Sequence, residues 1–101
     1  MTGPQVLEID GPKLKRMITL HVAFLLIDIR SPEEYARSHI KTAINLPADI
    51  EKISKAIPAK DTPVVLYDGD GVGSRLLVEA CEKKGFLNIV NLTGGFGAYR
   101  D

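Results

Sequence analysis

The sequence predicts a single α/β domain over residues 1–101, with a mostly parallel central sheet flanked by helices on both faces. Short apolar runs alternate with segments of helical periodicity along the chain, which is typical of strands joined by crossover helices. The run over 23–29 is almost continuously apolar, as is usual for a strand buried on both faces. A length of 101 residues suits one compact domain.

The charge balance excludes two classes of partner. Lys and Arg number 13, and so do Asp and Glu, so the chain carries no formal net charge. We therefore expect neither nucleic acid nor an anionic membrane as a partner. The early apolar run Val22–Ile27 is too short to span a bilayer and does not resemble a signal peptide. A cytoplasmic location is the resulting expectation.

The first quarter of the chain predicts a strand, a helix and a second strand. Residues 6–9 have the composition of a short strand. Asp10 is suited to cap a helix over 12–20, in which proline occupies the first turn. The apolar run over 23–29 predicts the next strand, which is the strongest strand signal in the sequence.

The clearest helix start follows that strand. Ser31 is a natural N-cap, Pro32 suits the first helical position and Glu34 completes a capping box. The remaining predicted elements are a short strand over 43–47, a helix after Asp49 that ends before Pro58, a strand over 64–67, a helix from about Ser74 to Lys84 that ends at Gly85, a strand over 88–92 and a last helical turn over 96–100.

The segment VVLYDGDGVGSR, residues 64–75, is the main candidate for a functional site. Here a strand leads into a glycine-rich loop and then a helix, and parallel sheets bind ligands beyond the carboxyl ends of their strands. The candidate residues of this loop are Asp68, Gly69, Asp70, Gly71, Val72, Gly73, Ser74 and Arg75. Arg75 is the best candidate among them for contact with an anion or a partner.

Two segments resemble the signatures of the rhodanese superfamily. LIDIRSPEEYARSHIKTAINLP, residues 26–47, contains Asp-x-Arg, an acidic helix start, His-Ile and Ala-x-Asn-x-Pro. NLTGGFGAYR, residues 91–100, resembles the closing Leu-x-Gly-Gly-x-x-Ala-aromatic pattern. Ser38 and Thr42 depart from the family, which usually has glycine at both positions. The resemblance implies a rhodanese-like domain over nearly the whole chain.

The resemblance also implies a role for the loop. Rhodanese domains carry sulfane sulfur on a cysteine directly after the strand, where loop amides stabilise a thiolate or persulfide. In this sequence that position belongs to Asp68, whereas Gly71 and Ser74 match the family and Gly73 stands where active members often have arginine. A carboxylate is a hard oxygen anion and cannot form a persulfide. The domain is therefore expected to be inactive as a sulfurtransferase and to have a binding or regulatory role.

Two interpretations of Asp68 follow. Its side chain can accept hydrogen bonds from loop amides and hold the loop closed. Alternatively, its carboxylate imitates the thiolate or persulfide anion, so that a protein partner, which the sequence does not identify, still recognises the site. A different function is also open, in which the chain is a sulfurtransferase-related enzyme that uses a thiol of its partner.

A third functional class is an aspartate-based phosphatase. Asp68 and Asp70 follow an apolar strand, as in the haloacid dehalogenase-like phosphatases, where the first aspartate attacks phosphorus beside Mg²⁺ and the second is the general acid–base. Such enzymes need further acidic metal ligands from later strands. After Glu82 no acidic residue occurs before Asp101, so the sequence argues against this class.

The other polar candidates have structural interpretations. Asp28 and Arg30 lie two positions apart on a strand, so we expect an ion pair or hydrogen-bond network beneath the loop. His39 has no second histidine or cysteine at ligand spacing, and neither a metal nor a cofactor is expected. Cys81, the single cysteine, lies on the apolar side of its helix and is expected in the core.

Overall fold

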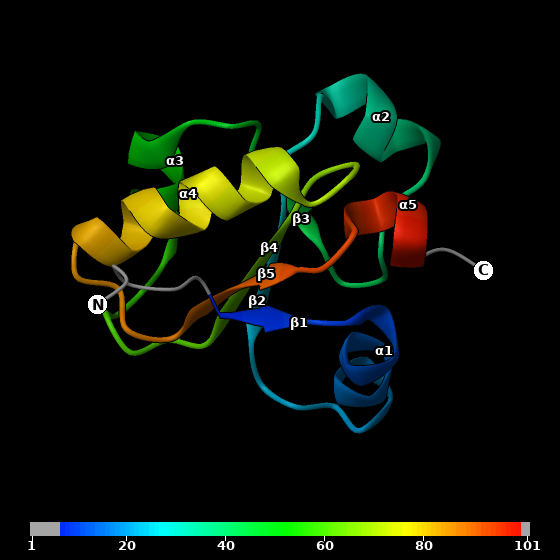
Figure 1. The fold of residues 1–101 in the computed structure, drawn as a ribbon, viewed down its shortest axis with the longest axis horizontal. Helices are drawn as coiled ribbons and strands as arrows, with labels where there is room; N and C mark the ends of the chain where they lie inside the picture. Colours follow the sequence, from blue (N-terminus) through cyan, green and yellow to red (C-terminus); the bar gives the residue numbers. More distant parts are fainter. Residues whose placement is uncertain (1–6, 100–101) are drawn as a thin grey trace, which may run out of the picture.

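The predicted α/β architecture is confirmed by a computed structural model that describes residues 7–99. The elements are β1 (Glu8–Ile9), α1 (Gly11–Thr19), β2 (Leu25–Asp28), α2 (Pro32–Arg37), β3 (Ile44–Asn45), α3 (Ile50–Ala56), β4 (Val64–Tyr67), α4 (Val72–Lys83), β5 (Ile89–Leu92) and α5 (Gly95–Tyr99). All five strands form one parallel sheet in the order β1-β5-β4-β2-β3. The central strand is therefore β4 (Figure 1).

Helices cover both faces of the sheet, as predicted. Helices α3 and α4 lie on one side, and α1 and α5 lie on the other (Figure 1). On β4, Val64 and Leu66 pack into the core beneath α3 and α4, whereas Val65 and Tyr67 pack toward α1 and α5. All four residues of β4 are buried, which explains why this strand reads as a continuous apolar run.

Side-chain caps begin three helices where the sequence predicted them. An Asp10 oxygen accepts a hydrogen bond from the Lys13 amide at 2.8 Å at the start of α1. Ser31 and Glu34 form the complete capping box of α2. Asp49 caps α3 by accepting hydrogen bonds from its first-turn amides. Within residues 7–99, no helix has the length and apolar character needed to cross a membrane.

Helix α4 begins two residues earlier than predicted. The expected start was Ser74, but the helix runs from Val72. The Asp70 carboxylate accepts a hydrogen bond from the Val72 amide at 2.9 Å, and Gly71 turns the chain at a φ of 88°. These local contacts offset the low helix propensity of Gly73. Val6 and Arg100, which the sequence placed in the first strand and the last helical turn, lie outside the described residues.

Candidate functional site

The candidate loop follows the carboxyl end of the central strand β4 and enters α4 (Figure 1). It is packed against α5 by two backbone hydrogen bonds. The Phe96 amide donates to the Asp68 carbonyl at 2.8 Å, and the Gly97 amide donates to the Gly69 carbonyl at 3.0 Å. The segment that the sequence singled out is thus enclosed by β4, α4 and α5.

The Asp68 carboxylate is turned into the loop and accepts hydrogen bonds from two backbone amides. The Gly71 amide donates to Oδ1 at 2.5 Å, and the Ser74 amide donates to Oδ2 at 3.0 Å. The Ser74 hydroxyl lies 3.1 Å from Oδ1. We call the amides of Gly71 and Ser74 the loop donors. Because they lie at the N-terminus of α4, they favour a negatively charged acceptor.

Asn91 of β5 contacts the loop at Ser74 and Gly71. It was not identified as a site residue from the sequence. Its side chain is only 1% exposed. Its Oδ1 lies 2.5 Å from the Ser74 hydroxyl, and its Nδ2 donates to the Gly71 carbonyl at 3.0 Å. A buried amide needs such partners, because an unpaired one would destabilise the fold. The available signal was a single asparagine within the otherwise apolar strand Ile89–Leu92.

Two glycines are required by close approaches to Asp68. A Cβ on Gly95, whose φ is 62°, would lie 2.6 Å from the Asp68 carbonyl oxygen and 2.7 Å from the Asp70 amide nitrogen. A Cβ on Gly73 would lie 2.8 Å from Asp68 Oδ2. Gly95 therefore allows two backbones to touch, whereas Gly73 leaves room for the carboxylate itself.

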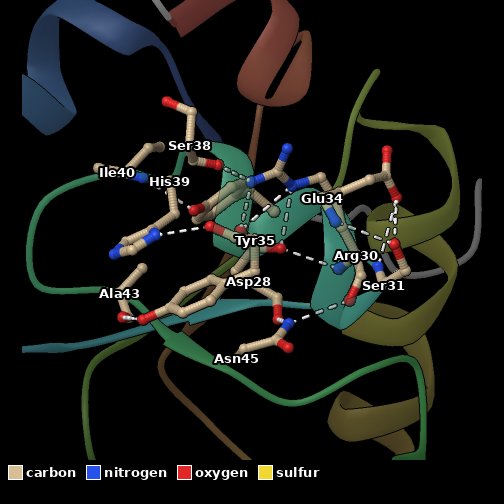
Figure 2. Close-up of polar contacts among 11 residues, drawn as sticks. Asp28, Arg30, Ser31, Glu34, Tyr35, Ser38, His39, Ile40, Ala43 and Asn45 are labelled. Carbon is tan, nitrogen blue, oxygen red and sulfur yellow. Dashed lines mark hydrogen bonds and ion pairs between the residues drawn. The ribbon is translucent and has the colours of Figure 1, made fainter.

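The predicted ion pair between Asp28 and Arg30 is confirmed beside the loop (Figure 2). The Asp28 side chain is fully buried, and Arg30 Nη2 donates to it at 2.7 Å. The same nitrogen donates to the Ser38 carbonyl at 2.6 Å, and the guanidinium lies 4.3 Å from the centre of the Phe96 ring. The hydrogen bond from Arg30 to Asp28 raises the pKa of the guanidinium above its ordinary value. The pair therefore connects the end of β2 to α2 and α5.

Two neighbouring side chains also have structural partners. The Tyr67 hydroxyl accepts a hydrogen bond from the Ile40 amide at 3.1 Å, and burial raises the pKa of this hydroxyl. His39 Nδ1 lies 2.8 Å from the Tyr35 carbonyl oxygen, and its ring stacks on the Tyr35 ring (Figure 2). Among residues 7–99, no group of three or more His, Cys, Asp or Glu side chains could hold a metal ion.

The remaining candidates lie outside the loop interior. Arg75 forms an ion pair with Glu8 of β1, and the other Glu8 oxygen accepts a hydrogen bond from the Thr93 hydroxyl at 2.9 Å. Cys81 is completely buried in the core beneath α3 and α4, as the sequence predicted. Burial raises the pKa of its thiol to about 11. Structure therefore brings Asp68, Gly71, Gly73 and Ser74 together and leaves Arg75 and Cys81 engaged elsewhere.

Comparison with known proteins identifies the family of this fold. Residues 12–101 match the Rhodanese-like domain family. A sulfurtransferase of Allochromatium vinosum is 33% identical over 92 residues, which cover 91% of this chain and 86% of the relative. The thiosulfate sulfurtransferase PspE of Escherichia coli is 34% identical over 70 residues, which cover 67% of each protein.

Solved structures agree with this assignment. A rhodanese-like domain protein of Staphylococcus aureus superimposes with a TM-score of 0.80 at 26% identity, covering 95% of this chain and 93% of that one. The Alr3790 protein of Anabaena superimposes with a TM-score of 0.82 over 90% of this chain and 74% of that one, at 23% identity, a likeness of fold alone. The chain belongs to the rhodanese-like domain family and is related to sulfurtransferases.

Proposed function

We propose that this rhodanese-like domain is inactive as a sulfurtransferase and acts as a binding or regulatory domain through the face of its β4–α4 loop. One observation carries the proposal: the Asp68 carboxylate accepts hydrogen bonds from both loop donors. By its resemblance to the family, Asp68 stands where active relatives carry the sulfur-bearing cysteine. The groups that would stabilise a persulfide therefore already bind a carboxylate.

The chemistry of the side chains supports this proposal. Sulfane transfer needs a soft thiolate that attacks sulfur and then releases it to an acceptor, which an aspartate cannot do. Cys81 is the single cysteine of the sequence. It is completely buried, and because burial raises the pKa of its thiol to about 11, it stays neutral at physiological pH. The chain thus offers no thiolate for the reaction.

A binding role is consistent with the outer surface of the loop. Asp68 supplies a carboxylate, and Gly69 and Asp70 are exposed beside it. A partner that recognises an anion in this loop would therefore meet one without any sulfur chemistry. The phosphatase alternative lacks support in the described residues, because Asp68 and Asp70 both accept loop hydrogen bonds and no third acidic ligand joins them.

The test is a thiosulfate-to-cyanide sulfur-transfer assay of four proteins: the natural chain, Asp68→Ala, Asp68→Cys and Cys81→Ala. We expect no sulfur transfer by the natural chain or by Asp68→Ala. We expect Asp68→Cys to gain sulfur-transfer activity, because its thiol would lie beside the loop donors. Activity of the natural chain above that of an assay without protein would overturn the proposal. Loss of that activity in Cys81→Ala would assign it to Cys81, whereas dependence on an added thiol protein would support the partner-thiol alternative.

The binding role needs its own experiment. A photo-cross-linking amino acid at Gly69, where a Cβ would have no neighbour within 4 Å, should capture the partner from cells of the source organism. The same residue at exposed Leu87 is the matched control, because this position follows the other end of α4. The captured protein, once purified, should bind the natural chain more tightly than Asp68→Ala. Equal affinity for both chains would contradict a role of the loop carboxylate.

A further inference from the structure

A hollow of about 230 Å³ lies beside the end of α1 and the start of β2. Its lining residues are Ile18, His21, Val22, Ala23, Phe24 and Thr42. Among residues 7–99, His21 and Thr42 are the non-glycine residues with left-handed backbone, at φ values of 55° and 76°. Two residues far apart in sequence, both in a disfavoured conformation, therefore meet at one small cavity.

The backbone at both positions favours glycine. After α1, the His21 amide donates to the Ile18 carbonyl at 3.1 Å and the Val22 amide donates to the Met17 carbonyl at 3.0 Å. This is the helix-ending pattern in which glycine is preferred at the left-handed position. At Thr42 the branched Cβ makes a left-handed conformation a clear outlier. Residues in such disfavoured backbone conformations are concentrated at active sites, ligand contacts and switch regions.

The chain segments that supply the lining residues are basic in composition. The segments 11–27 and 35–48, which supply the lining residues, contain no Asp or Glu. Their basic residues are Lys13, Lys15, Arg16, Arg37 and Lys41. The whole chain has equal numbers of basic and acidic residues, so all of its acidic residues belong to the other segments. Exposed Lys41 directly precedes Thr42, so positive charge adjoins the hollow itself.

The interior of the hollow is apolar. Ile18, Val22 and Phe24 provide its aliphatic and aromatic lining. Val22 is 46% exposed and nearby Leu20 is 72% exposed, so large apolar side chains face solvent at this edge. The volume is below the range of about 300–1,000 Å³ that is usual for small-molecule pockets, and it suits one inserted side chain.

We propose that this hollow binds an acidic segment of a protein partner through one bulky apolar side chain. The apolar side chain packs among Ile18, Val22 and Phe24, and the flanking carboxylates of the partner face the basic segments. The imidazole of His21 and the hydroxyl of Thr42 offer hydrogen bonds at the rim. A concave hollow favours an inserted side chain over a flat membrane surface. The site is independent of the loop at Asp68 and of the function proposed for it.

The first test is an NMR titration of the full ¹⁵N-labelled chain with the synthetic peptide Glu-Asp-Phe-Asp-Glu. We expect the peptide to shift the amide signals of residues 18–24 and of Thr42. Replacing its phenylalanine by alanine should weaken binding about tenfold, the effect of losing one buried apolar side chain. Lack of shifts at millimolar peptide, shifts confined to other residues, or equal binding of Lys-Lys-Phe-Lys-Lys would each overturn the proposal.

Variants of the chain separate binding from folding. His21→Gly and Thr42→Gly remove the rim side chains and relieve the backbone, so we expect weaker peptide binding without a lower midpoint of urea unfolding. Lys41→Glu should weaken binding about fivefold, and Lys60→Glu, which lies outside both basic segments, should not. Lower stability with unchanged binding in the glycine variants would make the side chains structural and overturn the proposal. So would binding to phosphatidylglycerol vesicles in place of the peptide.

Discussion

The loop after β4 and the hollow beside β2 both contain left-handed backbone, but different residue types adopt it in the two regions. In the loop and the turn that packs on it, the left-handed residues are Gly71, Gly94 and Gly95. At the hollow they are His21 and Thr42. Glycine in the loop lets polar backbone atoms touch, whereas the hollow keeps side chains at strained positions and leaves space between them.

The comparison separates a closed site from an open one. Asp68 accepts hydrogen bonds from the loop donors, so an incoming anion would have to displace the carboxylate of the protein itself. The hollow, in contrast, has an unfilled volume of about 230 Å³ and a largely apolar lining. Hydrogen bonds to Asp68 therefore stabilise the loop. At the hollow, by contrast, His21 and Thr42 have strained backbone conformations. The following changes test this contrast, from the largest expected effect to the smallest.

Gly95→Ala should have the largest effect, because its Cβ would meet three backbone atoms of residues 68–70 within 2.7 Å. Overpacking together with a left-handed alanine is expected to lower the free energy of unfolding by about 3 kcal/mol. The control is Gly69→Ala, whose Cβ would meet no atom within 4 Å. Urea denaturation of both variants gives the comparison. Equal losses would mean that the loop is not closely packed on α5.

Asp68→Asn should come second. The amide side chain has one acceptor oxygen where the carboxylate has two, so one loop donor loses its acceptor, and we expect a loss of about 2 kcal/mol in urea unfolding. Asp70→Asn is the matched control, because its remaining oxygen can still accept the hydrogen bond from the Val72 amide. If both variants were equally stable, the hydrogen bonds to Asp68 would not hold the loop closed.

Gly73→Ala tests whether Gly73 is needed because of the carboxylate. Its Cβ would lie 2.8 Å from Asp68 Oδ2, so we expect the natural chain to lose about 1 kcal/mol. In the Asp68→Ala background that contact is removed, and alanine should stabilise the helix by about 1 kcal/mol relative to glycine. A double-mutant cycle by urea unfolding measures this coupling. The same effect in both backgrounds would show that the two positions are independent.

Thr42→Gly should have the smallest effect. Relief of the left-handed threonine stabilises by about 1–2 kcal/mol, and the greater freedom of glycine in the unfolded chain offsets about half of that. The midpoint of thermal unfolding should therefore stay the same or rise slightly. In contrast, Thr19→Gly at the end of α1 should lower the midpoint, because glycine is a poor helix former. A fall in both variants would argue that Thr42 is not strained.

The sequence alone determined the elements whose signals are local. Three helices begin at side-chain caps, Asp10, Ser31 and Asp49, which contact amides no more than three positions away. Each cap can therefore be predicted from a short stretch of sequence. The apolar run of β4 and the Asp28–Arg30 pair were predicted for the same reason. The start of α4 was predicted too late in the sequence, because the glycines around it favour a loop and the hydrogen bond from the Val72 amide to Asp70 was not foreseen.

Tertiary structure decided the contacts that join distant segments. Ser74 meets Asn91 across 17 positions, and Arg75 meets Glu8 across 67. The hollow exists only where the end of α1 meets Thr42. Composition and motifs identified the loop and its carboxylate, because strand, glycines and helix are neighbours in the chain. The tertiary structure decides which donors contact that carboxylate and which side chains line the hollow, because the parallel strands bring remote residues together.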